Sequence, residues 1–368
     1  MPVRVFLIGL FCLLAPFRTV SLAQTATESQ TGAQIYQTAC AACHGPDGRG
    51  APKSSVGFDI DLPDFTDCGF SSPEADADWI AIVHQGGSVR SFNSLMPAFG
   101  AALTEPQIGL VVGHLRTFCR EKGWPRGDLN LPRPLVTEKA FPENEAVLTT
   151  SISRSGGASI GNQFLFERRV GKRGQYEVAV PLEVRHDDNG GWRRGLGDIA
   201  VAYKHALYDS APRGSIVSAG SEFVFPTGKE TEGLGGGEKI VELFGTVSQA
   251  LPRDWFLHGH AGLERPLAVD GAHNESFWRG AVGRSIFQDR WNRAWTPMIE
   301  LLGAREHAPG EHAEWDVVPQ VQVSLSRRQH VLLNAGLRVP VNERSDRGKT
   351  LMFYLLWDWF DGGLFTGW

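Results

Sequence analysis

The spacing of hydrophobic residues changes once along this chain of 368 residues. Up to about residue 121, apolar residues recur every three or four positions, as in the segment from Ile108 to Phe118. From about Glu145 onward they alternate with polar residues, as in the segment from Tyr176 to Arg185. A period near 3.6 predicts amphipathic helices, and a period of 2 predicts strands with one apolar face. The pattern therefore predicts a helical region followed by an all-β region.

The β region, residues 145–368, divides into about twelve predicted strands. Each strand supplies roughly ten residues, and turns that contain Gly, Asp or Pro separate them. The predicted strands begin near residues 145, 159, 175, 196, 214, 238, 253, 275, 294, 314, 329 and 349.

The two regions are joined by residues 122–144, which follow neither period. Prolines stand at positions 125, 132, 134 and 142, with charged residues scattered between them. Such a composition is typical of a semi-extended connector at a domain boundary. We therefore predict a linker here.

The N-terminus has the composition of a secretory signal. Arg4 precedes the apolar run from Val5 to Phe17, and the small residues Ser21 and Ala23 flank Leu22 before a cleavage point. This order predicts a signal peptide over residues 1–23, with the helical domain at 24–121. The alternative is an uncleaved anchor, which the short apolar run disfavours. The sequence thus predicts export from the cytoplasm.

The net charge of the chain and the length of its apolar runs exclude some classes of protein, and the strand pattern narrows the rest. A net charge of −5 argues against a nucleic-acid partner, and no later apolar run reaches the roughly 18 residues of a membrane-spanning helix. A soluble sandwich or propeller remains one alternative and an outer-membrane barrel the other. The even strand number, strands of about ten residues and a C-terminal Trp368 favour the barrel. Tryptophans near segment ends, as in an interfacial girdle, are Trp255, Trp278, Trp291, Trp295 and Trp315.

The second face of the strands carries ionisable residues that a soluble core could not bury cheaply. We expect this face to line a wet lumen. Its polar members include Glu177, Glu183, Asp198, Lys204, Glu222, Glu242, His258, His260, Glu300, Asp316 and Arg338.

The helical domain contains the sequence Cys40-Ala41-Ala42-Cys43-His44. Two thiols at this spacing add to the vinyl groups of one porphyrin, and the following His becomes an axial iron ligand. The motif predicts one covalent haem c on Cys40 and Cys43, with His44 on the iron. A redox-active cysteine pair that precedes a His by chance is the alternative.

The sixth iron ligand is predicted from the loop Leu95-Met96-Pro97-Ala98-Phe99. Met96 is the only Met between the haem motif and residue 120, while His84 and His114 are the rival ligands. The haem motif, this loop and the start Leu103-Thr104-Glu105-Pro106-Gln107 of the closing helix resemble class I cytochromes c. The resemblance covers roughly residues 29–121 and favours Met96 as the ligand.

Cys68 and Cys119 lie in the same region and belong to no motif. In an exported domain they could form a disulfide, or they could be two buried thiols. The sequence leaves both alternatives open.

Two short motifs in the β region add a second resemblance. Gly195-Leu196-Gly197-Asp198-Ile199 and Phe225-Pro226-Thr227-Gly228 resemble an outer-membrane family associated with meta-cleavage phenol degradation. We expect these residues to shape hairpins and to have no catalytic role. His258 and His260 share one strand face; a metal site and simple solvation are both open there.

Together these features predict an all-α cytochrome c domain fused to an antiparallel transmembrane barrel of about 12 strands. The expected function is electron transfer in the outer membrane, with the haem domain in the periplasm beside redox partner proteins, and an electron carrier rather than an enzyme. One alternative is an Fe(II) oxidase, by resemblance to fused cytochrome–porin iron oxidases. The other is a small-solute porin with an accessory cytochrome.

Overall fold

The computed structural model describes residues 30–153, 159–186, 191–267, 273–288, 293–343 and 347–359. The predicted signal peptide, Trp291 and Trp368 lie outside these residues. None of the helices in the described part of the chain has the length and apolar character needed to cross a bilayer.

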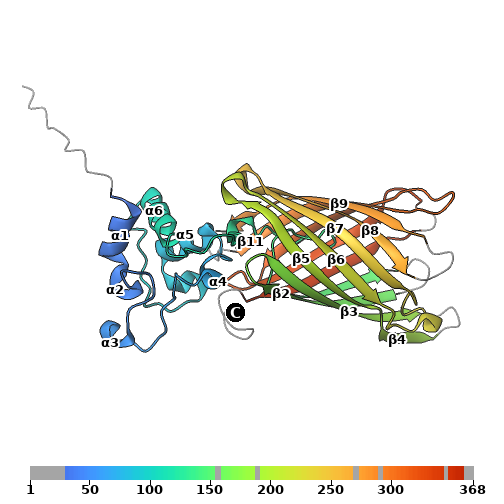
Figure 1. Cartoon of the computed structure of the whole chain (residues 1–368), viewed down its shortest axis with the longest axis horizontal. Helices are drawn as coiled ribbons and strands as arrows, with labels where there is room; N and C mark the ends of the chain where they lie inside the picture. Colours follow the sequence, from blue (N-terminus) through green and yellow to red (C-terminus); the bar gives the residue numbers. More distant parts are fainter. Residues whose placement is uncertain are drawn as a thin grey trace, which may run out of the picture. The chain divides into compact units, whose positions relative to one another are not determined.

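The first region is a small helical domain, drawn in blue to teal in Figure 1. Short helices alternate with loops. Its helices, with a final 3-10 turn in the connecting segment, are α1 Gly32–Ala39, α2 Ala41–His44, α3 Lys53–Val56, α4 Cys68–Ser71, α5 Asp76–Gln85, η1 Gly87–Arg90, α6 Glu105–Leu115 and η2 Gly127–Leu129.

The two main helices, α1 and α6, begin at the same kind of cap. Thr31 and Gln34 form a reciprocal capping box on α1, and Thr104 and Gln107 form one on α6. The helices pack so closely that a Cβ on Gly32 would lie 2.0 Å from the carbonyl oxygen of Leu110. The predicted apolar face of α6 is buried in the core of the domain. The helix expected from the sequence is confirmed.

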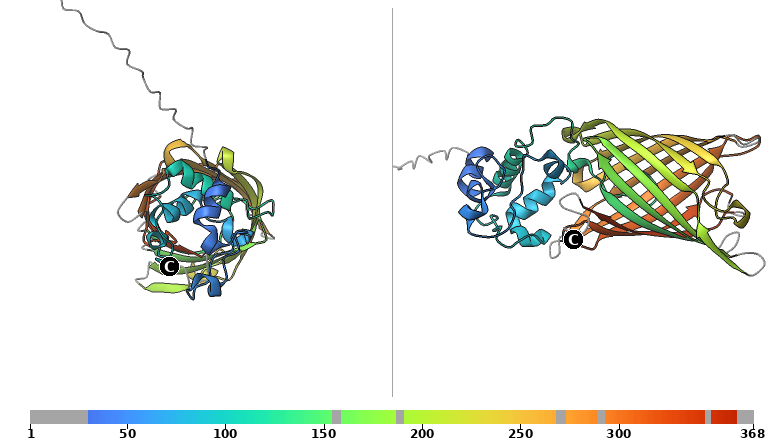
Figure 2. Two further views of the ribbon diagram at one scale, coloured as in Figure 1. Left: turned by 90° about the vertical axis from the view of Figure 1, so that its left-hand side faces the viewer. Right: turned by 60° about the horizontal axis from the view of Figure 1, so that its bottom comes forward.

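The second region is a closed antiparallel barrel (Figures 1 and 2). Fourteen strands are described; β4 pairs only with β3 and β10 only with β11, and the remaining twelve close into a ring in which β1 pairs with β14 and β9 with β11. The ring strands are β1 Glu145–Ser153, β2 Ser159–Val170, β3 Gly174–His186, β5 Ile199–Ser210, β6 Ser215–Phe225, β7 Lys239–Ala250, β8 Trp255–Leu267, β9 Glu275–Arg284, β11 Arg293–Glu306, β12 Glu314–Ser324, β13 Val331–Pro340 and β14 Thr350–Asp358. The extra strands are β4 Trp192–Leu196 and β10 Ile286–Gln288.

The apolar face of the strands points outward, as a membrane barrel requires. On β5, the side chain of Leu207 is 63% exposed, whereas its neighbours Lys204 and Ala206 are each 1% exposed. The same alternation holds on β3, where Tyr176 and Val178 are exposed and Glu177 is buried. Apolar residues outside and polar residues inside, on an even number of strands, are the features of an outer-membrane barrel. The predicted fold class is confirmed.

The segment between the two regions lies against the barrel interior. Residues 129–143, which we term the luminal segment, have no helix or strand beyond the last residue of η2. Leu135 packs against Leu302, Val318 and Tyr354, and Phe141 packs against Ile216. The lumen was expected to hold water at its polar residues. Instead, part of its polar wall is covered by this segment.

Candidate functional site

The predicted haem residues meet at one cavity of about 480 Å³. Cys40, Cys43, His44 and Met96 all contribute to its wall. The rest of the wall includes large apolar side chains, among them Phe65, Trp79, Phe99, Val111 and Leu115. An apolar cavity of a few hundred Å³ with a small number of placed polar groups is the usual form of a cofactor site.

The sequence Cys40–His44 forms a tight helical turn at the junction of α1 and α2. The backbone N–H of His44 donates to the Cys40 carbonyl at 2.9 Å, so both thiols and the imidazole belong to one turn. Cys40 and Cys43 are both free thiols. Burial, together with the neighbouring Cys43, raises the pKa of the Cys40 thiol to about 11.

His44 and the loop after it are held by two other residues of the cavity wall, Tyr36 and Phe65. The Tyr36 hydroxyl donates to the Gly45 carbonyl at 2.6 Å, which fixes the loop that leaves α2. The imidazole lies 5.2 Å from the Phe65 ring, measured between centroids, and burial lowers its pKa. Its buried Nδ1 has no hydrogen-bond partner in the described part of the chain. Two free thiols, an imidazole and an apolar wall are the donor set that fits a covalently attached haem.

Met96 lines the same cavity but belongs to a loop much later in the sequence than the haem motif. Its loop is fastened to α5 and η1: the Gly87 N–H donates to the Met96 carbonyl at 3.0 Å, and the Phe99 N–H donates to the Val83 carbonyl at 2.9 Å. The Met96 side chain also packs against the domain core. The loop therefore brings the Met96 thioether to the wall of the same cavity as the His44 turn.

The two rival histidines are engaged elsewhere. His84 lies beside Gly100, where an added Cβ would come within 2.7 Å of the imidazole. His114 packs against Tyr36 and Phe118, with ring centroids 5.3 and 5.0 Å away. Neither His is among the residues that line the cavity. This placement favours Met96 over both.

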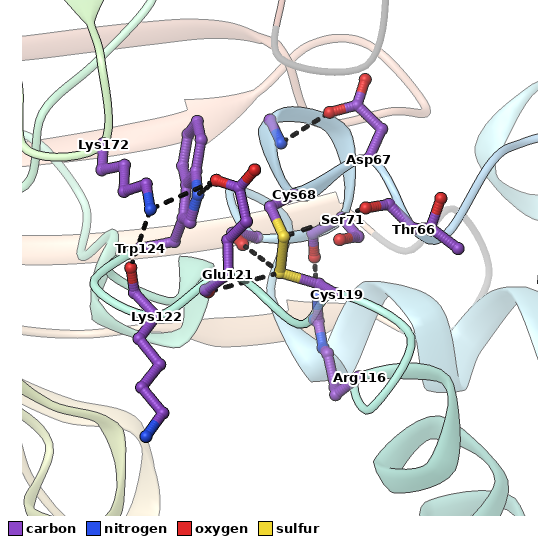
Figure 3. The surroundings of a disulfide bond; sticks show 12 residues. Thr66, Asp67, Cys68, Ser71, Arg116, Cys119, Glu121, Lys122, Trp124 and Lys172 are labelled. Atoms are coloured by element: carbon purple, nitrogen blue, oxygen red, sulfur yellow. Dashed lines mark hydrogen bonds and ion pairs between the residues drawn. A yellow bond between two sulfur atoms is a disulfide. The ribbon is translucent and has the colours of Figure 1, made fainter.

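Cys68 and Cys119 form a disulfide between α4 and the chain after α6 (Figure 3). Around it, the Asp67 carboxylate accepts from the Gly69 N–H at 2.8 Å, and the guanidinium of Arg116 donates to the Ser71 carbonyl. The sequence left this pairing open, and the structure resolves it. The cross-link stabilises the domain and lies outside the cavity wall.

An ion cluster joins α5 to the chain beyond α6. The Asp76 carboxylate accepts from Arg116 at 2.8 Å and also pairs with Arg126. Burial opposes ionisation of Asp76, but the hydrogen bonds and positive charges of the two arginines outweigh it and lower the pKa of this carboxyl.

His258 and His260 line the lumen but contact the luminal segment. His258 lies 3.0 Å from the Pro132 carbonyl through Nε2 and 2.8 Å from the Ser248 hydroxyl through Nδ1. The Nδ1 of His260 accepts from the Glu138 N–H at 3.4 Å. Both histidines therefore belong to the polar contact between the barrel wall and the luminal segment.

The two short β-region motifs contact each other, although 30 residues separate their contacting positions. The Asp198 carboxylate accepts from the Gly228 N–H at 2.9 Å, and the Thr227 hydroxyl donates to the Gly197 carbonyl at 2.9 Å. Both motifs thus shape the β4–β5 and β6–β7 connections. The expected structural role agrees with this geometry.

Sequence reasoning missed the polar residues of the luminal segment. Arg133, Glu138 and Lys139 are largely buried and paired with charged residues of the barrel. No distinctive signal in the sequence indicates this burial, since charged residues in a proline-rich stretch are ordinary in an exposed linker.

Comparison with known proteins identifies the helical domain. Residues 27–115 match the family model described as cytochrome C oxidase, cbb3-type, subunit III. The match covers the haem motif and Met96 and ends at the last residue of α6. This part of the chain is a cytochrome c-type domain, which implies haem c. No protein with a curated description matches the sequence.

Several solved barrels resemble the second region at low identity. An outer membrane channel from Pseudomonas putida F1 is 12% identical, with a TM-score of 0.44 over 62% of this chain and 100% of that one. The NanC porin is 10% identical, with a TM-score of 0.41 over 58% and 99%. The KdgM porin is 6% identical, with a TM-score of 0.37 over 58% and 99%. At these scores the likeness carries no argument, and the barrel is defined by its own strand pairing.

Proposed function

We propose that this chain is a haem c electron-transfer protein anchored in the outer membrane by its barrel. Cys40 and Cys43 would hold one haem through thioether bonds, and His44 and Met96 would bind its iron. When bound, the haem supplies a one-electron Fe(III)/Fe(II) couple. In this proposal the chain acts as an electron carrier.

The observation that carries the proposal is the convergence of Cys40, Cys43, His44 and Met96 on one apolar cavity. The apolar wall excludes water, and a thioether ligand favours the reduced iron more than a second imidazole does. Both effects raise the reduction potential. We therefore place the domain among acceptors or relays of electrons.

The partners follow from the location. Strand β1 follows the connector directly, and in an even-stranded barrel both chain ends lie on one side, which is the periplasm. We propose that the haem domain lies in the periplasm and exchanges electrons with soluble redox proteins there.

The test of ligation uses three single variants of the full-length protein. Met96→Ala is expected to change the haem absorption spectrum and to lower the midpoint potential, because the iron loses its thioether. His84→Ala and His114→Ala are the matched controls and are expected to change neither. A Met96→Ala spectrum identical to that of the unchanged protein, with a change in either His variant, would assign the ligand to that His.

One observation favours the Fe(II) oxidase as a second candidate. Carboxylates directly opposite one another on neighbouring strands form a row around the lumen, interrupted only at Ala202. In order from β14 to β11 the row is Asp358, Glu145, Glu167, Glu177, Ala202, Glu222, Glu242, Glu264, Glu275 and Glu306. Directly opposed residues share one face, so the row lines the lumen with carboxylates. Arg133, Lys139 and Lys204 pair with its early members, and later members such as Glu242 and Glu264 are the ones that would attract cations.

Fe(II) added to intact cells distinguishes this candidate from simple electron relay. An oxidase would show haem reduction with one electron taken from each Fe(II), and Glu242→Gln/Glu264→Gln would slow it. Reduction by dithionite would be unchanged in the same variant. Absence of any Fe(II)-dependent reduction would remove this candidate and leave the carrier proposal intact.

A further inference from the structure

The luminal segment is bonded to strands all around the barrel wall. Its partners lie on strands that are far apart in the ring, including β5, β8, β11 and β14. A segment that touched one wall only would contact adjacent strands. Contacts on opposite sides show that residues 129–143 cross the lumen.

One carboxylate of the wall binds three consecutive backbone amides of the segment. Glu300 on β11 is fully buried and accepts from the N–H groups of Leu135 at 2.9 Å, Val136 at 3.2 Å and Thr137 at 2.6 Å. The Thr137 hydroxyl also donates to it at 2.6 Å. Charge-assisted bonds of this kind are roughly twice as strong as neutral ones. Glu300 therefore fixes the middle of the segment.

The carbonyl groups of the segment are bound by side chains from other strands. These bonds satisfy five of its backbone carbonyls inside the barrel. The contacts are Tyr354 Oη to Arg133 O at 2.6 Å, His258 Nε2 to Pro132 O at 3.0 Å, Thr246 Oγ1 to Glu138 O at 2.8 Å, Lys204 Nζ to Lys139 O at 2.9 Å and Ser218 Oγ to Ala140 O at 2.5 Å.

The segment also neutralises buried charges of the wall. Arg133 pairs with Glu145 at 2.5 Å and with Glu167 at 3.0 Å, and its other terminal nitrogen pairs with Glu138 of the segment at 3.0 Å. Lys204 of β5 pairs with Glu138. Glu145 and Glu167 lie directly opposite each other on neighbouring strands. Without the segment, their two carboxylates would face each other in the lumen without Arg133 between them. The wall and the segment are therefore complementary in charge.

We infer that residues 129–143 are a built-in plug that seals the barrel against the passage of small solutes. A twelve-stranded ring is wider than the eight-stranded barrels that side chains alone can fill, so closure needs added material. The luminal segment supplies that material from the same chain. The barrel is then an anchor in its resting state rather than an open pore. The inference concerns the barrel only and does not depend on the bound haem.

The experiment measures KCl conductance of the purified full-length protein in planar lipid bilayers. The unchanged protein is expected to give no open-channel steps. Arg133→Met removes the cation that lies between Glu145 and Glu167, while Lys139 stays 3.6 Å from Glu145. The loss of one partner in a buried ion pair should raise the open fraction about a hundredfold. Glu300→Gln, which keeps the side-chain size but removes the charge, should give a smaller rise. Arg168→Met, a change at an exposed Arg next to Glu167, is the matched control and should stay closed.

Replacement of residues 130–141 by a Gly/Ser linker of equal length provides a second test should either point variant fail to insert. Before each measurement, the heat-sensitive gel mobility that is typical of folded barrels verifies that the variant is folded. Open steps in the replacement and closure in the unchanged protein support the plug. Frequent open steps in the unchanged protein overturn the inference. So does an inserted replacement variant that stays closed.

Discussion

The two regions of this chain bury opposite kinds of residue. The helical domain places Tyr36, Ile108 and Val111 at its centre and keeps an apolar hollow beside two thiols, a His and a Met. The barrel exposes its apolar residues to the membrane and buries Glu300 and Lys204 in its interior. The difference shows that the surroundings of each region, water or lipid, decide which residue types it buries. The helical domain keeps a cavity, whereas residues 129–143 of the chain cover part of the barrel's inner wall.

The largest expected effect is a complete loss of covalent haem from the helical domain with no effect on the barrel. Cys40→Ser/Cys43→Ser removes both attachment points, so the purified protein should contain no covalent haem. The barrel should still insert, because no thiol contributes to its strands. The measurement is haem absorbance in a denaturing gel beside heat-sensitive mobility. Covalent haem in the double variant would contradict the assigned attachment.

The second effect is confined to the barrel. Arg133→Met removes one partner of a buried ion cluster, which should cost about 3–5 kcal/mol of barrel stability. Resistance of the barrel to unfolding in denaturant measures this loss, while the haem spectrum should stay unchanged. Arg168→Met should cost less than about 0.5 kcal/mol, as expected for an exposed position. Equal losses in both variants would mean that the buried network contributes nothing specific.

The third effect is confined to the helical domain. The disulfide between Cys68 and Cys119 closes a loop with a sequence separation of 51. In the chain-entropy model, its removal by Cys68→Ala/Cys119→Ala should cost about 4 kcal/mol. Denaturation followed by the helical circular-dichroism signal would report it, and the barrel's β signal serves as the internal control. A loss shared by both regions would show that they unfold together.

The smallest expected effect is a dependence on acid. The pKa of Asp76 is below its ordinary value of 3.8 in the folded domain, so its ion pairs with Arg116 and Arg126 add stability above that value. This stability should disappear as the pH falls through the lowered pKa. Asp76→Asn should remove this part of the acid sensitivity of helical-domain unfolding, with the barrel unaffected. An unchanged acid profile would show that other carboxyls dominate.

Local patterns were sufficient to predict the elements of both regions. The apolar period gave α6 with its Thr104 cap, and the predicted strand starts agree with the ring strands to within about three residues. The haem-site residues could be named because Cys40, Cys43 and His44 are adjacent in sequence and Met96 had few rivals. Each of these signals lies within a short stretch of chain.

The luminal segment could not be predicted because its contacts are long-range. Leu135 and Glu300 are 165 residues apart, and the segment itself has no period that marks it as buried. Its backbone is bound by wall side chains, so the residue types of the segment give little sign of the contact. The lumen, which looked merely polar in the strand pattern, is in fact complementary to this segment in charge and hydrogen bonding.

A spectroelectrochemical titration of the intact protein in detergent tests the central claim most directly. We expect one haem per chain and a single reversible one-electron transition. In both the oxidised and the reduced state, the absorption should be that of a low-spin haem with a thioether ligand. Absence of a reversible transition, or a high-spin spectrum with an open coordination position, would contradict an electron-transfer function for this barrel-anchored domain.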